Sequence, residues 1–447
     1  MAPWSVGFVS LGCAKNLVDS EHLAGILRAE GIPLARRAEE ADVILVNTCA
    51  FVGDAKEESL TAILRAGRWK QAGRCRALVV AGCLAQRYRT ALPAALPEVD
   101  AFIGLDDLES IGQVVRRLER GAGRCVAIGP RPRKLFEPLP TRLLMTGGPF
   151  AYLKIAEGCN HRCAFCAIPM IRGRQRSRRI ADIVREAEHL LAGGVRELNL
   201  VAQDTTAYGR DRGDGTSLPR LLRALGGIGG RFWIRVLYGH PAGITDELLE
   251  VMGATRQVCR YLDVPIQHSH PEMLRAMHRA GTAEAVRRLP ERIRAALPGV
   301  TLRTTCLVGF PGETAAHFAD LLAYIRAAEF DHLGVFVYSP EEGTAGYRLR
   351  PRVAARCVAR RRSCLLRAQQ AIVRRHALAR IGTTDVVLLL DPPTRAVPWA
   401  VARHAGQAPE VDGETRVRVS RPAVAGTWLR VRYTGAEGYD LCAEPLA

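Results

Sequence analysis

The chain has 447 residues, which suggests about three domains at the usual size of roughly 150 residues each. Apolar residues make up 48% of the chain and charged residues 24%, a composition that excludes long disorder and collagen-like repeats. The formal net charge of +18 points to a polyanionic partner such as nucleic acid. Thirteen cysteines in a chain of this length favour metal binding or redox chemistry over disulfides.

The sequence also lacks the marks of a membrane or secreted protein. The longest uninterrupted apolar stretch, Ala77–Ala85, is far shorter than the ~20 residues that a membrane-spanning helix needs. No basic residue precedes the first apolar stretch, and no small-residue cleavage site follows it. We therefore expect a cytoplasmic protein with no membrane contact.

The first 130 residues alternate short apolar runs with helix-like stretches. Runs at Val6–Leu11, Val43–Val46 and Ala77–Ala81 predict strands, and each is followed by a segment with helical periodicity. This βαβαβ order is typical of a parallel sheet, so we expect an N-terminal parallel α/β domain over residues 1–130.

One cysteine follows each of these three strands. Cys13, Cys49 and Cys83, which we call the N-terminal triad, stand where the loops of a parallel sheet share one edge and where ligands bind. We expect the three thiols to converge there as metal ligands. The alternative is that they are unrelated packing thiols, because free cysteine behaves as a small apolar residue. Their repetition at one structural position favours the ligand interpretation.

A break rich in Pro and Gly at Gly129–Gly148 precedes a second series of strands and helices. Six βα units predict a partial (βα)6 barrel over residues 145–380, with its site at the carboxyl ends of the strands. Short alternating strands in residues 383–447 predict a small antiparallel β-barrel of the OB type. The six barrel strands are expected at Tyr152–Ala156, Val195–Val201, Phe232–Tyr238, Leu262–Ile266, Thr301–Val308 and Leu333–Tyr338.

The clearest chemical motif follows the first predicted barrel strand and reads Cys159-Asn-His-Arg-Cys163-Ala-Phe-Cys166. Three thiols at this spacing, which we call the loop triad, can each bind one iron of a cubane cluster and leave the fourth iron open. A structural zinc ion would need a fourth Cys or His nearby. The local candidate, His161, is poorly placed between two of the cysteines, so a cluster is the better interpretation.

This motif, its place after the first strand and Phe165 before its last cysteine resemble the radical S-adenosylmethionine superfamily. Further stretches are similar to the methylthiotransferases of that superfamily and, among these, to the RimO branch, whose C-terminal barrel is a TRAM domain. The stretches around the N-terminal triad are Ser10–Glu21, Val46–Phe51 and Ala81–Tyr88. Those similar to the RimO branch are Lys154–Cys163, Leu200–Gly209, Tyr338–Thr344 and Ala405–Gly413.

The resemblance implies two 4Fe-4S clusters and S-adenosylmethionine as cofactors. Each triad would hold one cluster, and the open iron of the loop cluster would chelate S-adenosylmethionine. One S-adenosylmethionine would methylate sulfur at the N-terminal cluster, and a second would yield a 5′-deoxyadenosyl radical that abstracts hydrogen from the substrate. The cofactors carry this chemistry, so no acid–base pair is expected among the protein residues.

Residues at the carboxyl ends of the barrel strands are further candidates for binding S-adenosylmethionine. Each could instead serve a loop cap or a tight turn. Gln203 and Gly309 are favoured because their surroundings match family positions near the adenosyl ligand. The candidate residues are Phe165, Gln203, Gln267, Thr305 and Gly309. The other seven cysteines share no metal-site spacing and are interpreted as packing thiols.

The positive charge is unevenly distributed. Residues 343–384 contain eleven Arg and no acidic residue, and could form either a surface for ribosomal RNA or a solvated helix face. Residues 384–447 hold seven Arg and eight acidic residues, and this near-neutral barrel argues for a protein substrate rather than RNA. Five more Arg within Arg172–Arg179 could steer an anionic substrate or cap a helix.

The resemblance thus predicts methylthiolation of the β-carbon of an aspartate in small-subunit ribosomal protein S-twelve. The expected partners are that protein, free or in the subunit, a sulfur donor, an electron donor such as flavodoxin or ferredoxin, and ribosomal RNA. The alternatives are methylthiolation of adenosine in transfer RNA and a non-catalytic iron–sulfur binding module. The transfer-RNA family usually reads Gly-Cys-x-Met-Asn, whereas here Ala14, Lys15 and Asn16 follow Cys13.

Overall fold

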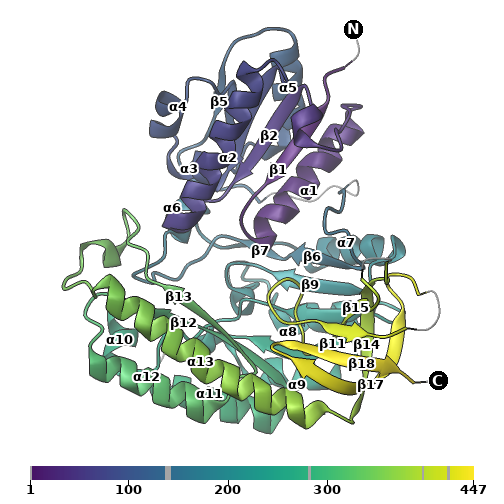
Figure 1. Cartoon of the computed structure of the whole chain (residues 1–447). Coiled ribbons are helices and arrows are strands. Elements are labelled where there is room, and N and C mark those ends of the chain that lie inside the picture. The colour runs from purple at the N-terminus through teal and green to yellow at the C-terminus, as the bar shows by residue number, and fades with distance from the viewer. Residues whose placement is uncertain (1–2, 136–141, 280–282, 395–396, 420–422, 447) are drawn as a thin grey trace. The chain divides into compact units, whose positions relative to one another are not determined.

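The computed structural model describes residues 3–135, 142–279, 283–394, 397–419 and 423–446 (Figure 1). Its contacts divide the chain into two compact units. The first comprises Met1–Met145, Lys154–Arg178 and Ser339–Thr344, and the second comprises Thr146–Leu153, Arg179–Tyr338 and Ala345–Ala447. Within the described residues, no helix combines the length and the apolar character needed to cross a membrane.

A parallel sheet organises the first unit. Its strands lie side by side in chain order as β1 (Val6–Ser10), β2 (Val43–Thr48), β3 (Ala77–Gly82), β4 (Ala101–Ile103) and β5 (Cys125–Ala127). β2 and β3 are buried along their whole length, as expected for parallel strands covered on both faces. The sheet confirms the predicted parallel α/β fold and extends it by two short strands, β4 and β5, that the apolar pattern did not predict.

Helices cover both faces of this sheet. They are α1 (Ala14–Ala29), α2 (Gly53–Gln71), α3 (Cys83–Arg87), α4 (Ala91–Ala95) and α5 (Ile111–Glu119), with 3-10 turns at Ala38–Glu40 and Leu108–Ser110. Apolar side chains of α1 and α5 pack in one core, and those of α2 and α3 pack in another. α1 is unusual because it also buries six polar side chains, those of Lys15, Asn16, Asp19, Ser20, Glu21 and His22.

A short hairpin frames the loop that carries the second cysteine motif. β7 (Ala156–Glu157) pairs in antiparallel fashion with β8 (Arg176–Ser177), and α6 (Ile168–Ile171) lies in the loop between them. Ile171 of α6 belongs to the same apolar core as Cys83 of α3. Both cysteine motifs are therefore parts of the first unit.

A six-stranded sheet forms the centre of the second unit. Its strands are β6 (Phe150–Lys154), β9 (Glu197–Val201), β10 (Trp233–Val236), β11 (Val258–Asp263), β12 (Thr301–Val308) and β13 (His332–Val337). They lie side by side in that order, and the pairings from β9 to β13 are parallel. This arrangement agrees with the predicted partial barrel of six βα units.

The position of β11 differs from the strand predicted at Leu262–Ile266. The strand begins at Val258 and ends at Asp263, because Pro265 has no N–H with which to continue the ladder. Beyond the proline, Gln267 forms only an isolated bridge with Cys306.

The helices of the second unit alternate with these strands (Figure 1). They are α7 (Ile180–Ala192), α8 (Leu218–Gly226), α9 (Asp246–Ala254), α10 (Pro271–Ala276), α11 (Ala283–Ala296), α12 (Ala315–Ala328) and α13 (Ala355–Arg380), with 3-10 turns at Thr205–Ala207, Pro241–Gly243 and Ala345–Arg348. The long helix α13 confirms the helix predicted for the Arg-rich run, and it contacts α12 and β13.

The C-terminal strands close into a barrel. They are β14 (Thr384–Asp391), β15 (Ala400–His404), β16 (Thr415–Val417), β17 (Trp428–Glu437) and β18 (Asp440–Pro445). All pairings are antiparallel except that of β16 with β18, which is parallel. The predicted small barrel is confirmed, with the addition of this parallel closing pair.

The barrel is tied to the six-stranded sheet by charged residues, which we call the sheet–barrel network: Glu197, Arg235, Arg403 and Asp412. Arg235 Nε and Arg403 Nη2 donate to the two oxygens of Glu197 at 2.8 and 2.6 Å. Asp412 accepts from the Tyr261 hydroxyl at 2.8 Å. The loop between β15 and β16, which carries the RimO-like stretch Ala405–Gly413, is thus docked on the sheet.

Candidate functional site

The N-terminal triad gathers at the carboxyl ends of three neighbouring strands. Cys13 precedes the first residue of α1, Cys49 directly follows β2, and Cys83 begins α3. Ionisation of Cys13 or Cys49 would raise the pKa of the Cys83 thiol, so the three sulfurs share one electrostatic environment. The structure therefore brings together the three thiols whose convergence the strand pattern predicts.

Two glycines permit this close approach. Gly12 and Gly82 each precede a cysteine of the triad, and both have positive φ angles, of 90° and 93°. A Cβ atom at Gly12 would lie 2.7 Å from the Cβ of Cys49, and one at Gly82 would lie 2.3 Å from Oδ1 of Asn47. A larger residue at either position would therefore combine backbone strain with a clash at the strand ends.

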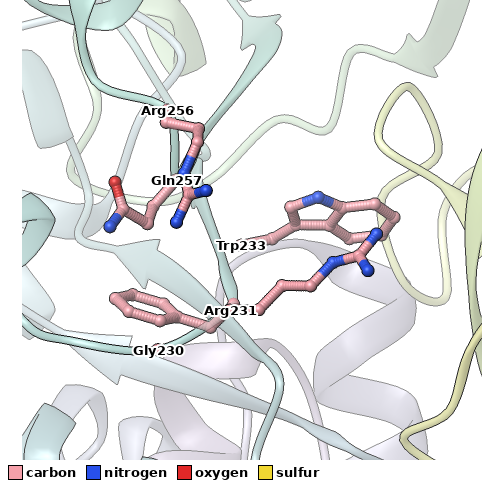
Figure 2. Close-up of a pocket in the computed structure, with 6 residues that line it drawn as sticks. Gly230, Arg231, Trp233, Arg256 and Gln257 are labelled. Carbon is pink, nitrogen blue, oxygen red and sulfur yellow. The ribbon is translucent and has the colours of Figure 1, made fainter.

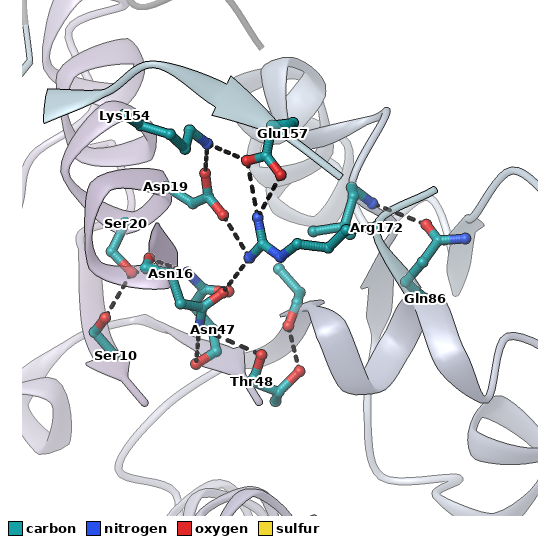
Figure 3. Close-up of polar contacts among 12 residues, drawn as sticks. Ser10, Asn16, Asp19, Ser20, Asn47, Thr48, Gln86, Lys154, Glu157 and Arg172 are labelled. Atoms are coloured by element: carbon teal, nitrogen blue, oxygen red, sulfur yellow. Dashed lines mark hydrogen bonds and ion pairs between the residues drawn. The ribbon is translucent and has the colours of Figure 1, made fainter. Parts of the chain in front are cut away.

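Buried polar side chains fix the three strand ends to one another (Figure 3). Asn16 Nδ2 donates to the carbonyls of Leu11 and Thr48 at 2.6 and 3.3 Å. Asn47 Nδ2 donates back to the Asn16 carbonyl at 2.9 Å. The Thr48 hydroxyl donates to the Ala81 carbonyl at 2.6 Å. These bonds link the exits of β1, β2 and β3, which hold the triad.

The three thiols differ in acidity. Burial raises the pKa of Cys83 to about 12 and also raises the pKa of Cys49. At Cys13, desolvation opposes ionisation, but the positive charges of Lys15 and Arg172 outweigh it and lower the pKa. Because a cysteine binds iron as its thiolate, a positive charge beside the triad favours the ligand form.

The loop triad is held by its own backbone. The Cys159 N–H donates to the Gly173 carbonyl at 3.1 Å, and the Cys166 N–H donates to the Cys163 carbonyl at 3.0 Å. Cys163 is buried, whereas Cys159 and Cys166 are partly exposed. Phe165 is also partly buried within this loop. The loop is thus a defined element of the first unit that keeps two of its three thiols accessible.

One group of side chains in the described structure lies close enough together to hold a single metal ion. A tetrahedral zinc site with Zn–S bonds of about 2.3 Å places its sulfurs about 3.8 Å apart. Across the described residues, the one group of three ligand atoms that all lie within 4.8 Å of one another is formed by His270, Glu272 and His317.

The histidine group is explained by helix capping. Nδ1 of His270 accepts the Glu272 N–H at 3.3 Å, and Nδ1 of His317 accepts the Thr314 N–H at 3.2 Å. An imidazole that accepts at Nδ1 carries its proton on Nε2, and Nε2 of His317 lies 3.0 Å from the Glu272 carboxylate. Neither Nε2 then offers a lone pair to a metal.

A buried set of charged side chains adjoins the N-terminal triad (Figure 3). This triad network consists of Asp19, Lys154, Glu157 and Arg172. Arg172 Nη1 donates to both oxygens of Glu157 at 2.8 and 2.9 Å, and its Nη2 donates to Asp19 at 3.0 Å. Lys154 pairs with the same two carboxylates. Burial opposes ionisation of Glu157, but Arg172 and Lys154 outweigh it and hold its pKa well below the usual range.

The sequence contained part of the signal for this network. Asn16 and Asp19 are three residues apart on α1, so they share one helix face. Lys154 and Glu157 both lie in the RimO-like stretch before the loop triad. The partner that joins them, Arg172, was interpreted only as one of five basic residues after the loop.

In the second unit, Gln203 lies directly beyond β9 as predicted. Both polar atoms of its side-chain amide are buried, and neither has a hydrogen-bond partner in the described structure. An unpaired buried amide costs free energy unless a ligand completes its bonds, so Gln203 fits a ligand-binding role. Gln267 has a positive φ of 70°, and its N–H donates to the carbonyl of Thr305 on β12 at 2.8 Å. Both of these side chains are partly exposed.

Gly309 is explained by the turn that it occupies. Its φ is 82°, and a Cβ atom would lie 2.7 Å from the Val358 side chain. Its N–H donates to the Glu313 carboxylate, which also accepts from Arg361 Nη1 at 3.0 Å. The alternative of a tight turn therefore accounts for this glycine, and a contact with S-adenosylmethionine stays a prediction, as it does for the other predicted ligand residues.

A pocket of about 360 Å³ lies away from these residues (Figure 2). It opens at the amino ends of β10 and β11, whereas Gln203 and Gln267 follow the carboxyl ends of their strands. Its Arg231 guanidinium lies 4.7 Å from the ring centroid of Trp428. The lining residues are Gly230, Arg231, Phe232, Trp233, Arg256 and Gln257.

The arginines of the two basic stretches, Arg172–Arg179 and α13, differ in their contacts and exposure. Arg176 and Arg178, like Arg172, bind the first unit itself: Arg176 Nη1 donates to the Arg174 carbonyl at 2.6 Å, and Arg178 Nη1 donates to the Lys154 carbonyl at 2.8 Å. These three arginines hold the stem of the loop, whereas Arg174 and Arg179 are exposed. On α13, Arg361 is buried against Glu313, whereas most of the other arginines are exposed.

Three family models match the chain and together span most of it. The Uncharacterized protein family UPF0004 matches residues 5–104, the Radical SAM superfamily matches residues 153–325, and the TRAM domain matches residues 381–446.

The fold is similar to the radical S-adenosylmethionine methyltransferase TsrM from Kitasatospora setae, with a TM-score of 0.57, 17% identity and coverage of 77% of each chain. It is also similar to the cobalamin-dependent radical enzyme OxsB, with a TM-score of 0.54, 12% identity and coverage of 83% of this chain and 56% of that one. The chain is a radical S-adenosylmethionine enzyme.

Curated relatives identify the family within the radical S-adenosylmethionine enzymes. The Ribosomal protein uS12 methylthiotransferase RimO of Syntrophus aciditrophicus is 46% identical over 100% of this chain and 99% of its own length. That of Pelotomaculum thermopropionicum is 44% identical over 98% of each chain. The chain belongs to the RimO family of radical S-adenosylmethionine methylthiotransferases.

Proposed function

We propose that this enzyme methylthiolates the β-carbon of an aspartate in ribosomal protein uS12. The RimO relatives are named for action on uS12, and their similarity extends over the whole chain. The observation that carries the proposal is the pair of three-thiol sites in the first unit, each one ligand short of a fully coordinated cubane cluster.

In this proposal, each triad holds one 4Fe-4S cluster, and Phe165, Gln203, Gln267, Thr305 and Gly309 contribute to the site for S-adenosylmethionine. When bound, these cofactors supply a methylated sulfur and a 5′-deoxyadenosyl radical. The protein orients the thiols of the N-terminal triad through the polar bonds between strand ends and the buried triad network.

The partners follow from this chemistry. Substrate uS12 is met in the cytoplasm, either free or in the small subunit, and a sulfur donor and an electron donor such as flavodoxin or ferredoxin sustain turnover. The near-neutral C-terminal barrel, whose loop is docked on the sheet, supports a protein substrate over transfer RNA. The exposed arginines of α13, such as Arg356, Arg360 and Arg374, would be available for contact with ribosomal RNA.

The division of labour between the triads is tested with the full-length chain. Replacing the three cysteines of the N-terminal triad by Ala should remove about half of the bound iron and abolish methylthiolation of uS12, while reductive cleavage to 5′-deoxyadenosine continues. The matched change in the loop triad should also remove about half of the iron but stop the cleavage. Loss of cleavage in the first variant, with the loop cluster intact, would contradict the proposal.

The substrate is tested in cells that lack this gene. Mass spectrometry should find uS12 without its methylthio group and transfer-RNA adenosines with normal modification. An unmodified transfer-RNA adenosine beside a normal uS12 would overturn the assignment of the substrate. Restoring the modification with the wild-type gene, but not with the triad variants, provides the control.

A further inference from the structure

Arg172 links the two cysteine sites of the first unit along the chain. It is the residue directly after α6, and α6 follows the loop triad. Through Ile171, α6 packs in the same apolar core as Cys83 of the N-terminal triad. The Arg172 side chain is nearly inaccessible to water, with 2% of it exposed. A buried cation is thus carried by the loop of one triad to the thiols of the other.

The orientation of this cation is fixed by four hydrogen bonds. Nη1 donates twice to Glu157, and Nη2 donates to Asp19 and, at 3.3 Å, to Oδ1 of Asn16. Asn16 is the same side chain that joins the strand ends beside the triad. A guanidinium held by so many partners loses little freedom when it meets a further acceptor.

Arg172 also acts on the N-terminal triad. Asn16, which accepts from Arg172 Nη2, donates its own N–H to the Cys13 carbonyl at 2.8 Å, so a chain of hydrogen bonds joins the guanidinium to the triad. The positive charge of Arg172 also favours the thiolate forms of Cys83, Cys13 and Cys49. Asp19 and Glu157 supply two negative charges that pair with the guanidinium, and Lys154 supplies the second positive charge. The triad therefore adjoins a balanced set of buried charges, of which Arg172 is the member whose charge acts on all three thiols.

We propose that Arg172 is a positioning residue that sets the electrostatic potential at the group held by the N-terminal triad and thereby raises the reduction potential of that group. This inference rests on the proposed function, since it requires a cluster at the N-terminal triad. Reduction adds one electron to the cluster, and a buried positive charge nearby favours the more negative state. Removing a negative charge from Glu157 should have the same sign of effect as adding a positive one.

The test uses the full-length chain with Cys159, Cys163 and Cys166 replaced by Ala, so that only the N-terminal triad can hold a cluster. The protein is reconstituted anaerobically with iron and sulfide and titrated with dithionite, which supplies the electron, while absorption and electron paramagnetic resonance report the reduced fraction. In this background, Arg172→Gln should lower the ratio of reduced to oxidised cluster at a fixed solution potential by about tenfold, or 59 mV for a one-electron couple. Glu157→Gln should raise that ratio.

The two variants should shift the reduction potential in opposite directions, and this distinguishes an electrostatic role from a structural one. A residue that merely holds the fold together would shift both variants in the same direction or would release iron from both. Arg172→Lys keeps the charge and should restore most of the wild-type potential. Arg142→Gln is the matched control, because it breaks another buried ion pair of α1, with Glu21, and should leave the potential unchanged.

Each outcome decides the inference. An unchanged potential in Arg172→Gln, or shifts of the same sign in both variants, would overturn it and leave the proposed function intact. If Arg172→Gln fails to hold iron, the rise expected for Glu157→Gln becomes the deciding measurement. Absence of iron from the background variant itself would contradict the proposed function, and the inference with it.

Discussion

Both units bury paired charges, but the two networks have different neighbours. The triad network balances two acids against two bases, and the positive charge of its Arg172 favours the thiolate forms of the N-terminal triad. The sheet–barrel network contains two acids and two Arg, and its arginines also donate to backbone carbonyls: Arg235 to Ala405 at 2.6 Å and Arg403 to Gln407 at 2.8 Å. One network adjoins the proposed cluster site, and the other attaches a barrel to a sheet.

The comparison teaches that burial alone does not mark a charge as functional. Removing charged groups from water costs several kcal/mol per ion, and each network offsets that cost with close pairing. The two networks differ in the groups, other than the paired carboxylates, on which each guanidinium acts. Carbonyl oxygens of the loop accept from one further nitrogen of Arg235 and one of Arg403 and so fix the loop, whereas the positive charge of Arg172 acts on the thiols that would hold the proposed cluster.

The largest effect should come from the acid at the centre of the sheet–barrel network. Glu197→Gln leaves Arg235 and Arg403 buried without a carboxylate, and should lower the stability of the second unit by about 3–5 kcal/mol. Glu157→Gln should cost less, because Arg172 keeps its pairing with Asp19. Urea unfolding followed by fluorescence and circular dichroism measures both. Equal losses of stability in the two variants would contradict the expected difference between the two networks.

A smaller effect is expected where the docked loop meets the sheet. Asp412→Asn removes the negative charge that accepts from Tyr261 and from the Ala408 N–H, each at 2.8 Å, and that pairs with Arg303. Because hydrogen bonds to charged groups are worth about 1.5–3 kcal/mol, the loop should open more often. Limited proteolysis should cut the loop between β15 and β16 faster than in the wild type. An unchanged cutting rate would mean that the loop is held by other contacts.

The strand ends of the first unit could be predicted because their signal is local. Apolar runs such as Ala77–Ala81 are long enough to identify strands, and a cysteine just past each run must then lie at the shared edge. β4 was missed because three apolar residues are too few to stand out. The triad network was missed for a different reason: Arg172 and Asp19 are 153 residues apart, and no spacing rule connects them.

Each unit should also lose stability at low pH, because each buries a neutral histidine. This loss should be smaller than the losses above. Burial, with the nearby charge of Arg380, holds the pKa of His404 well below its usual value, and burial does the same for His22 in the first unit. The unfolded chain takes up these protons near pH 6.5 and the folded chain does not, so stability is full above that pH and declines below it.

Each histidine should cost up to about 1.4 kcal/mol for each pH unit below that point. Thermal unfolding at pH 7.5 and 5.5 checks this, with the same measurement on His404→Gln and His22→Gln. Each variant should show a smaller fall in the midpoint of its own unit only. A fall as large as that of the wild type would contradict the role of the neutral imidazole.

The smallest effect is expected from an ion pair that lies at the surface of the second unit. Arg223 Nη1 contacts Glu247 Oε1 at 2.9 Å, close to the 2.8 Å between Arg235 and Glu197, but both side chains of the surface pair are 53% exposed. Water and salt screen such a pair, so Glu247→Gln should change stability by no more than about 1 kcal/mol. Urea unfolding beside Glu197→Gln makes the measurement. Because the contact distances are nearly equal, a large loss in Glu247→Gln would show that pairing rather than burial governs these networks.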